Sequence, residues 1–379
     1  MNIFKLTLFL TKGDKGEFGL SKQVQQQFLL TLKEPNNFEE RSYNQYLSQC
    51  LFMPKWKVVL FNVIALLFFI PICLFFLLKR CFVRQDTKIA SIGSFKGIEE
   101  VIPEEVTRNY DINNDVFNAG YSLSLSDVCF IVHHYYKFFL SPFFVLKCTI
   151  LIGSYSSIIR RYNPDQIFVH SEYSFTSSIL THYCNSKGIK HINIMHGEKG
   201  FLIRDSFFQY NVCYVWDKYY KDLFIQLRAE KGQFVIAVPP SLVINVQDNI
   251  NPELYSDYKY YLASYNSNEI QSIINSMSFV SKNGQSVKYR PHPRYSDIEL
   301  LKKYVDEQDI EYPQNVSIFS SISNLGTAVG STTTVLTQAY FSGKAVVLDD
   351  MTYKDQYVKA KELDSFLANK GLPTLSSLQ

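Results

Sequence analysis

The residues best suited to chemistry stand in two short loops of the C-terminal half of the sequence. The first loop reads Arg-Pro-His-Pro-Arg over residues 290–294, between an expected strand and an expected helix. Two prolines restrict the backbone of His292, and Arg290 and Arg294 supply charge that suits a phosphate. We therefore expect Arg290, His292, Pro293 and Arg294 to form a phosphate-binding loop. A proline-rich surface turn that carries an exposed histidine is the alternative.

The second loop follows about forty residues later and contains Gly330, Ser331 and Thr332, just before an apolar helical pattern. Hydroxyl groups and free N–H groups at the first turn of a helix form an anion site, which the helix dipole strengthens. An ordinary helix N-cap needs only one hydroxyl and is the alternative interpretation. Together the two loops predict a nucleotide-sugar pocket.

The N-terminal half offers candidate acids and bases at two expected strand ends. Glu172 follows one strand, and His196 and Glu198 follow another in a loop with glycines at 197 and 200. We expect Glu198 to act as general base, because a glycine-flanked loop can present its carboxylate to a substrate. Glu172 is expected to cap a helix or bind a sugar hydroxyl. His196 is either a second candidate base or a brace for the loop.

Several classes of protein are excluded by what the sequence lacks. It contains no P-loop, dinucleotide-binding, nucleophile-elbow or zinc-peptidase motif. Asp349 and Asp350 form an acidic pair without a third ligand, which favours a strand-end turn over a metal site. The net charge of +3 argues against a nucleic-acid partner, and seven cysteines without a C-x-x-C pair suit a reducing compartment.

Short β-branched runs alternate with helical patterns from about residue 88 onward, which predicts an α/β fold with parallel sheets. Expected strands are 88–92, 166–170, 191–195, 211–215 and 234–238, then 260–263, 286–289, 310–312, 327–329 and 345–348. Expected helices are 174–187, 268–282, 296–307 and 333–342. The two series, joined near Pro239, predict two facing Rossmann-like domains. Ligands of such sheets bind beyond the carboxyl ends of the strands, so we expect the site in the cleft between the domains.

One segment, 58–78, is almost entirely apolar and long enough to span a bilayer. It lies too far from Met1 for a cleavable signal peptide. Basic residues flank both ends, and the larger number on the C-terminal side favours a cytoplasmic location for the rest of the chain. Pro71 leaves a re-entrant hairpin open, and a buried core helix is a further alternative.

The order of these motifs resembles that of the bacterial sialyltransferases and polysialyltransferases of the GT-B fold. The resemblance covers about residues 166–350. His292 and Pro293 match the His-Pro motif of that family, whose histidine contacts the departing CMP phosphate. Ser331 and Thr332 match its paired-serine motif, with threonine in the second place. Its acidic D/E-D/E-G loop corresponds here to the loop that contains Glu198.

The resemblance implies an inverting, metal-independent glycosyltransferase without a cofactor. It would move sialic acid or a related acidic sugar from a CMP-sugar to a lipid-linked oligosaccharide, in the synthesis of capsule, O-antigen or another surface polysaccharide such as lipopolysaccharide. Glu198 and His292 would be catalytic, and Glu172 and His196 would bind the acceptor. A transferase that uses a UDP- or GDP-sugar and a non-catalytic membrane protein of polysaccharide assembly are the alternatives.

On this interpretation the chain has four parts. They are an N-terminal segment (1–56), a membrane helix (57–80), an acceptor domain (81–240) and a CMP-sugar donor domain (241–379). The expected location is the inner membrane of a bacterium, with the catalytic part facing the cytoplasm.

Overall fold

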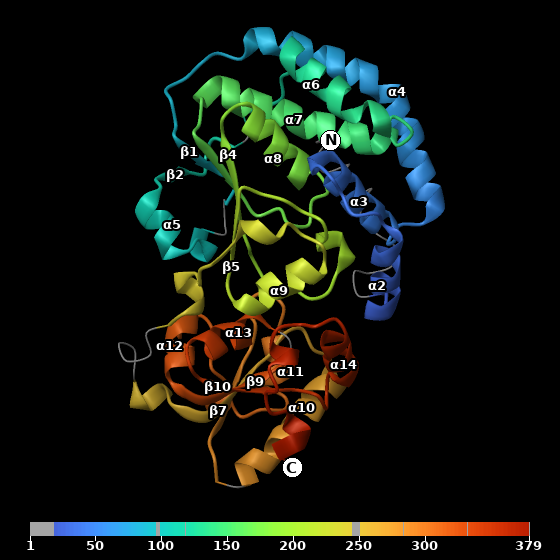
Figure 1. Cartoon of the computed structure of the whole chain (residues 1–379). Coiled ribbons are helices and arrows are strands. Elements are labelled where there is room, and N and C mark those ends of the chain that lie inside the picture. The colour runs from blue at the N-terminus through green and yellow to red at the C-terminus, as the bar shows by residue number, and fades with distance from the viewer. Residues whose placement is uncertain are drawn as a thin grey trace. The chain divides into compact units, whose positions relative to one another are not determined.

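The computed structural model describes residues 19–95, 99–117, 119–244, 251–282, 284–331 and 333–378. Within this part the chain forms two units, each built around a parallel β-sheet (Figure 1). The first unit comprises the described residues up to His196 together with Phe201–Ala237. The second comprises Gly197–Gly200 and the described residues from Val238 onward. The predicted α/β fold with two parallel sheets is confirmed.

The sheet of the first unit has the order β2-β1-β3-β4-β5-β6, and every neighbouring pair is parallel. Its strands are β1 (Ser91–Gly93), β2 (Ile112–Asn113), β3 (Gln166–Val169), β4 (Lys190–Ile194), β5 (Val212–Val215) and β6 (Phe234–Ile236). Most residues of β3, β4 and β5 are buried, as expected for a parallel sheet covered by helices. The sequence does not predict β2, because two residues show no periodicity.

Several helices of the first unit begin at a residue whose side chain accepts a hydrogen bond from the first turn. Ser21, Asn37, Ser124 and Asp217 do so, which satisfies N–H groups that have no partner within the helix. The helices are α2 (Lys22–Thr31), α3 (Phe38–Cys50), α4 (Lys55–Lys79), α5 (Glu104–Asn109), α6 (Leu125–Tyr135), α7 (Pro142–Tyr162), α8 (Ser177–Ser186) and α9 (Lys218–Gln226).

The helices α2 and α3 belong to the first unit, although the sequence predicts a separate segment over 1–56. α3 packs against α8, and its buried Tyr46 contacts the rings of Phe144 and Phe175. Arg41 of α3 pairs with Glu230 at 2.5 Å. The difference arises because these contacts join residues distant in sequence, which leave no local pattern.

Among the residues that the structure describes, two helices are long and apolar enough to cross a membrane: α4, with its extension to Phe82, and α7. They lie side by side (Figure 1). In α7, 72% of the most apolar stretch is buried, as in a core helix, whereas the corresponding figure for α4 is 11%. α4 therefore differs from a buried core helix, and it continues through Pro71 without a turn. Length and composition are weak indications of a membrane span, and they establish no location.

The second unit contains a four-stranded parallel sheet with the order β10-β9-β7-β8. Its strands are β7 (Ser256–Tyr261), β8 (Val287–Arg290), β9 (Leu325–Gly330) and β10 (Ala345–Leu348). Its helices are α10 (Ser267–Lys282), α11 (Ile298–Leu301), α12 (Ile318–Ser323), α13 (Thr334–Phe341) and α14 (Lys354–Glu362). Buried side chains of β7, such as Tyr260, pack against α10 residues that include Ile273 and Met277.

Two predicted elements of this unit are wrong in extent. The predicted strand 310–312 is a single bridge between Ile310 and Tyr289, because Pro313 cannot donate to a further ladder bond. The predicted helix 296–307 shortens to α11. The Ser296 hydroxyl accepts a hydrogen bond from the N–H of His292, so Ser296 belongs to the preceding loop.

A buried ion network joins the central strand β7 to the edge strand β8. Lys259 of β7 and Arg290 of β8 both pair with the carboxylate of Glu311, with 2.7 Å between Arg290 Nη1 and Glu311 Oε1. The three side chains are 0%, 8% and 5% exposed, respectively. Two cations this deeply buried need their shared carboxylate, since unpaired buried charge is strongly destabilising.

We expect the substitution Glu311→Gln to lower the free energy of unfolding of the second unit by about 3 kcal/mol or more, because it leaves two buried cations without an anion. Urea unfolding followed by hydrogen exchange in peptides from β7 and β8 measures this change. The control is Glu299→Gln, which removes an exposed pair with Lys302 and should leave stability unchanged. Equal stability of the two variants would contradict the expectation.

Candidate functional site

The first candidate site lies at the carboxyl edge of the second sheet. β8 and β9 both pair with β7, in registers that align Tyr261 with Arg290 and Tyr260 with Val329. The loops that follow β8 and β9 therefore leave the sheet at the same edge, which is where parallel sheets bind ligands. The loop after β8 is the predicted His-Pro loop, and the loop after β9 is the predicted hydroxyl loop.

The His-Pro loop is held by one shared hydroxyl. Ser296 Oγ accepts a hydrogen bond from the backbone N–H of His292 at 2.8 Å and donates to the carbonyl of Ala263, just beyond β7, at 2.6 Å. The imidazole of His292 stacks on the ring of Tyr295, with 4.5 Å between ring centroids. His292 is therefore fixed at the sheet edge while its side chain remains partly exposed.

The ring of His292 has a defined hydrogen-bonding pattern. Its Nδ1 accepts the backbone N–H of Arg294 at 3.1 Å, which assigns the proton of the neutral ring to Nε2. Partial burial and the nearby charge of Arg294 lower the pKa of His292 below its usual value. At neutral pH the ring is therefore uncharged, and Nε2–H is a hydrogen-bond donor suited to an anion.

The hydroxyl loop begins where β9 passes close to β7. A Cβ atom at Gly330 would lie 3.0 Å from the carbonyl oxygen of Tyr261, so this close approach favours glycine. Ser331 follows directly and is partly buried. Thr332 lies outside the described residues. Thr333 is the N-cap of α13, and its hydroxyl is buried without a hydrogen-bond partner in the described part of the chain.

An unsatisfied hydroxyl beside the first turn of a helix is a feature that a bound anion would resolve. The sequence motif includes Thr333, but sequence reasoning assigns the anion contacts to Gly330, Ser331 and Thr332. The position of Thr333 at the N-cap of α13 makes its hydroxyl a candidate anion contact.

Arg290 does not have its charge available for a phosphate. Its side chain is buried, pairs with Glu311 as described above, and donates to the carbonyl of Val316 at 2.8 Å. The predicted phosphate contact of Arg290 is thus replaced by a structural role. Arg294 and Pro293 are exposed at the start of the turn, so Arg294 is the arginine of this loop that can reach a ligand.

The acidic pair after β10 accepts hydrogen bonds from backbone N–H groups. The buried carboxylate of Asp349 accepts hydrogen bonds from the N–H groups of Met351 and Thr352 at 2.9 and 2.8 Å. Asp350 accepts the N–H of Ser376 at 3.0 Å. Asp349 therefore closes the turn after β10, and Asp350 binds Ser376, which lies 26 residues away.

Glu198 lies in the short loop 197–200 that belongs to the second unit. A Cβ atom at Gly200 would lie 2.8 Å from the carbonyl oxygen of Leu363, so only glycine allows this approach. Burial raises the pKa of Glu198 to about 7, although hydrogen bonds from the N–H groups of Leu367 and Phe366 act in the opposite direction. A carboxylate with this pKa can take up and release a proton near neutral pH.

The second candidate site lies in the first unit, at the carboxyl ends of the adjacent strands β3 and β4. Glu172 is fully buried, and its Oε1 lies 4.0 Å from Nδ1 of His196. The rings of His170 and His196 are 4.8 Å apart between centroids. Asn193 donates to Glu172 Oε2 at 3.3 Å. The predicted acceptor residues Glu172 and His196 are thus neighbours.

Two glutamines of α3 hold the loop that carries Glu172. Gln45 Nε2 donates to the carbonyl groups of Glu172 and Arg204, both at 2.8 Å. Gln49 Nε2 donates to the carbonyl of Tyr173 at 2.7 Å. Sequence reasoning misses these positioning residues, and their spacing of four along one helix is the only signal that could have drawn attention to them.

Neither a protein-family model nor a curated protein matches the chain. Some solved structures are similar to it over part of its length. The glycotransferase of kitacinnamycin is 11% identical over 78% of this chain and 88% of its own, with a TM-score of 0.44. CalG4, the calicheamicin glycosyltransferase, is 9% identical over 73% and 75%, with a TM-score of 0.41.

UDP-GlcNAc 2-epimerase from Methanocaldococcus jannaschii is 11% identical over 54% of this chain, with a TM-score of 0.35. The chain spans 65% of the length of that epimerase. Structural similarity at these TM-scores says nothing about the activity of this chain. The activity is inferred from its own residues.

We expect the stability of the protein to fall, relative to a Glu198→Gln variant, as the pH rises from about 4.5 to about 7. In that window the unfolded chain has released the proton of Glu198 while the folded chain still holds it, so the higher pH favours unfolding. Above this window the difference becomes constant. Melting temperatures of both proteins from pH about 5 to about 8 measure the effect.

The control is Glu253→Gln, which changes an exposed glutamate of the same unit. Its melting temperature should follow that of the wild type at every pH. A difference between wild type and Glu198→Gln that stays the same at every pH would show that Glu198 titrates normally.

Proposed function

We propose that the chain is a glycosyltransferase of the GT-B type that takes an acidic sugar, such as sialic acid, from a CMP-sugar. One observation carries the proposal. His292 and Ser331 follow β8 and β9, which flank β7 in the same parallel sheet. The two strands lie about 10 Å apart across β7, a separation that side chains from both loops and one phosphate group can fill together.

The chemistry of these residues supports stabilisation of a leaving phosphate. The Nε2–H of neutral His292, the hydroxyl groups of Ser331 and Thr333, and the first N–H groups of α13 all donate hydrogen bonds. Arg294 adds a positive charge. Such donors act on the charge that accumulates on the phosphate as the bond from the sugar to the phosphate breaks, and removal of a single donor typically raises the barrier by about 3 kcal/mol. No step in this scheme requires a metal ion.

Glu198 is proposed as the general base that takes the proton of the acceptor hydroxyl during an inverting displacement. Its pKa of about 7 suits proton transfer at neutral pH.

Glu172 and His196 are proposed to bind the acceptor, because a buried carboxylate beside an imidazole offers hydrogen-bonding groups for sugar hydroxyls. If Glu172 is the base instead, Glu172→Gln and not Glu198→Gln will abolish turnover.

The exposed apolar surface of α4 supports a location at a membrane. We propose that α4 attaches the protein to the cytoplasmic face of a bacterial inner membrane. The acceptor would then be a lipid-linked oligosaccharide of surface polysaccharide synthesis, such as that of capsule or O-antigen. A soluble nucleotide sugar and a lipid-linked acceptor meet at that face, which explains why one chain carries both an apolar helix and two α/β units.

The donor is tested by incubating the purified protein with CMP-sialic acid, UDP-sugars and GDP-sugars in turn, with a lipid-linked acceptor. We expect release of CMP only, measured by chromatography of the free nucleotides. Release of UDP or GDP alone would replace the proposed donor and leave the transferase activity standing. Release of no nucleotide under any condition would favour a non-catalytic role in polysaccharide assembly.

We expect His292→Ala to reduce turnover about a hundredfold or more, because it removes one donor to the leaving phosphate. His292→Asn keeps a side-chain acceptor for the N–H of Arg294 but lacks the Nε2 donor, so it should be similarly impaired. His133→Ala, at an exposed position on α6, is the control and should retain full turnover. Wild-type turnover in both His292 variants would refute the assigned role.

A further inference from the structure

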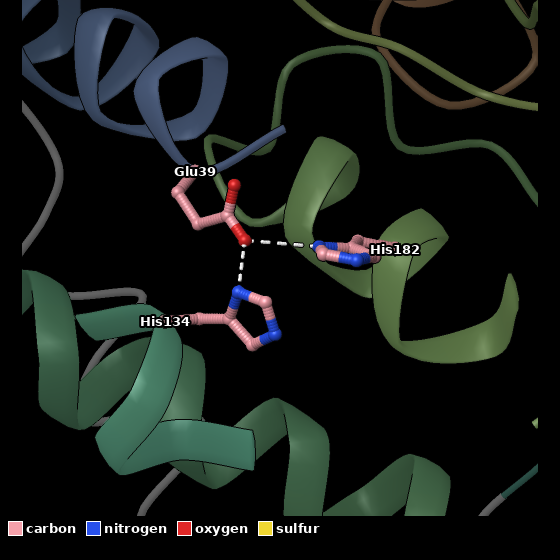
Figure 2. Close-up of side chains that lie close together, drawn as sticks. All are labelled: Glu39, His134 and His182. Carbon is pink, nitrogen blue, oxygen red and sulfur yellow. Dashed lines mark hydrogen bonds and ion pairs between the residues drawn. The ribbon is translucent and has the colours of Figure 1, made fainter. Parts of the chain in front are cut away.

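Three ionisable side chains of the first unit converge at a place that the proposed transfer reaction does not use. Glu39 of α3, His134 of α6 and His182 of α8 point toward one another (Figure 2). Oε1 of Glu39 lies 2.5 Å from Nδ1 of His134 and 2.9 Å from Nδ1 of His182. One ligand atom from each of the three residues lies within 4.8 Å of the other two.

This arrangement brings together residues from three separate helices. Glu39 stands in the first turn of α3, His134 at the end of α6, and His182 in the middle of α8. The contact between α3 and α8 along their length fixes the distance between Glu39 and His182. The cluster is thus built by the packing of the helices.

The surroundings suit a bound cation. The side chain of Glu39 is 8% exposed, whereas those of His134 and His182 are 22% and 29% exposed. The carboxylate is therefore shielded, while the imidazole side remains open to solvent for entry of an ion and for a water ligand. The ring of Phe130 packs against both histidines, and that of Phe38 stacks on His182, which limits the number of rotamers that each imidazole can adopt.

The carboxylate of Glu39 accepts a hydrogen bond from Nδ1–H of each imidazole. Burial raises the pKa of Glu39, but the hydrogen bond from His182 and the charges of both histidines lower it more, so the net pKa lies below its usual value. Burial lowers the pKa of His134 despite the opposing charge of Glu39. A metal ion bound through Nδ1 would take the place of the Nδ1 protons, and each neutral ring would keep its proton on Nε2.

We propose that Glu39, His134 and His182 bind a divalent transition-metal ion of the zinc type. Two imidazoles and one carboxylate are ligands that zinc accepts, with a water molecule in the fourth position. Ligand atoms about 2 Å from a tetrahedral zinc ion lie about 3.3 Å apart. The separations from Glu39 therefore need to open by less than about 1 Å to admit the ion.

The ion holds α3 in place and so acts on the second candidate site from a distance. α3 carries Gln45 and Gln49, whose side chains bind the backbone of the loop around Glu172. A metal that joins the first turn of α3 to α6 and α8 fixes the direction of this helix. The existence of this site does not depend on the proposed transfer reaction.

The test uses the full-length protein, stripped with a chelator and titrated with Co²⁺, whose visible absorption reports the ligand geometry. We expect the wild type to bind one ion with the absorption of a tetrahedral or five-coordinate nitrogen and oxygen site. His182→Ala and His134→Ala should each weaken binding by about tenfold or more, since each removes a ligand. The matched control is His133→Ala, because His133 is exposed and its ring contacts that of His134, but it supplies no ligand atom to the cluster.

Melting temperatures with and without Zn²⁺ provide a second measurement on the same proteins. Zn²⁺ should raise the melting temperature of the wild type and of His133→Ala, and should raise that of Glu39→Gln and His182→Ala clearly less at the same concentration, because the weakened site binds the folded state less tightly. Circular dichroism of the stripped variants establishes that they are folded.

If the wild type binds no ion, the cluster is a hydrogen-bonded network only. If all variants bind as the wild type does, the ion lies elsewhere. Either result overturns the proposal.

Discussion

Backbone hydrogen bonds hold β8 and β9 on either side of β7, and the three strands run in the same direction. His292 and Ser331 leave the sheet at one edge for this reason alone. With a different strand order the same residues would be a surface histidine and an ordinary helix start. Lys259 and Arg290 reinforce the arrangement, because their shared partner Glu311 joins β7 to β8 from within the unit.

The sheet of the first unit also brings residues from two loops together at the carboxyl ends of its strands. β3 and β4 are adjacent and parallel, so Glu172 and His196 emerge together. Here the loops are held from outside the sheet by the glutamines of α3, and α3 is anchored by its packing on α8. The histidine and glutamate cluster at the start of α3 extends this support. Residues on the helices of the first unit thereby influence the geometry of the loop around Glu172.

Local patterns in the sequence predict the strands well, because short apolar runs between helical segments have few other structures. They also predict that His292 and Ser331 follow strands. They do not predict the role of Arg290, since its carboxylate partner stands 21 residues away and only burial selects it. The cluster of Glu39, His134 and His182 is invisible for the same reason: it joins helices that are distant in sequence. α11 begins later than its pattern because Ser296 belongs to the preceding loop.

Hydrogen exchange with and without CMP-sialic acid tests most directly whether the two loops bind one nucleotide. The account predicts slower exchange in the peptides that follow β8 and in those that follow β9, at the same nucleotide concentration, with no change in peptides from α5. Protection after only one of the two strands, or after neither, would contradict a shared phosphate site at this edge of the sheet.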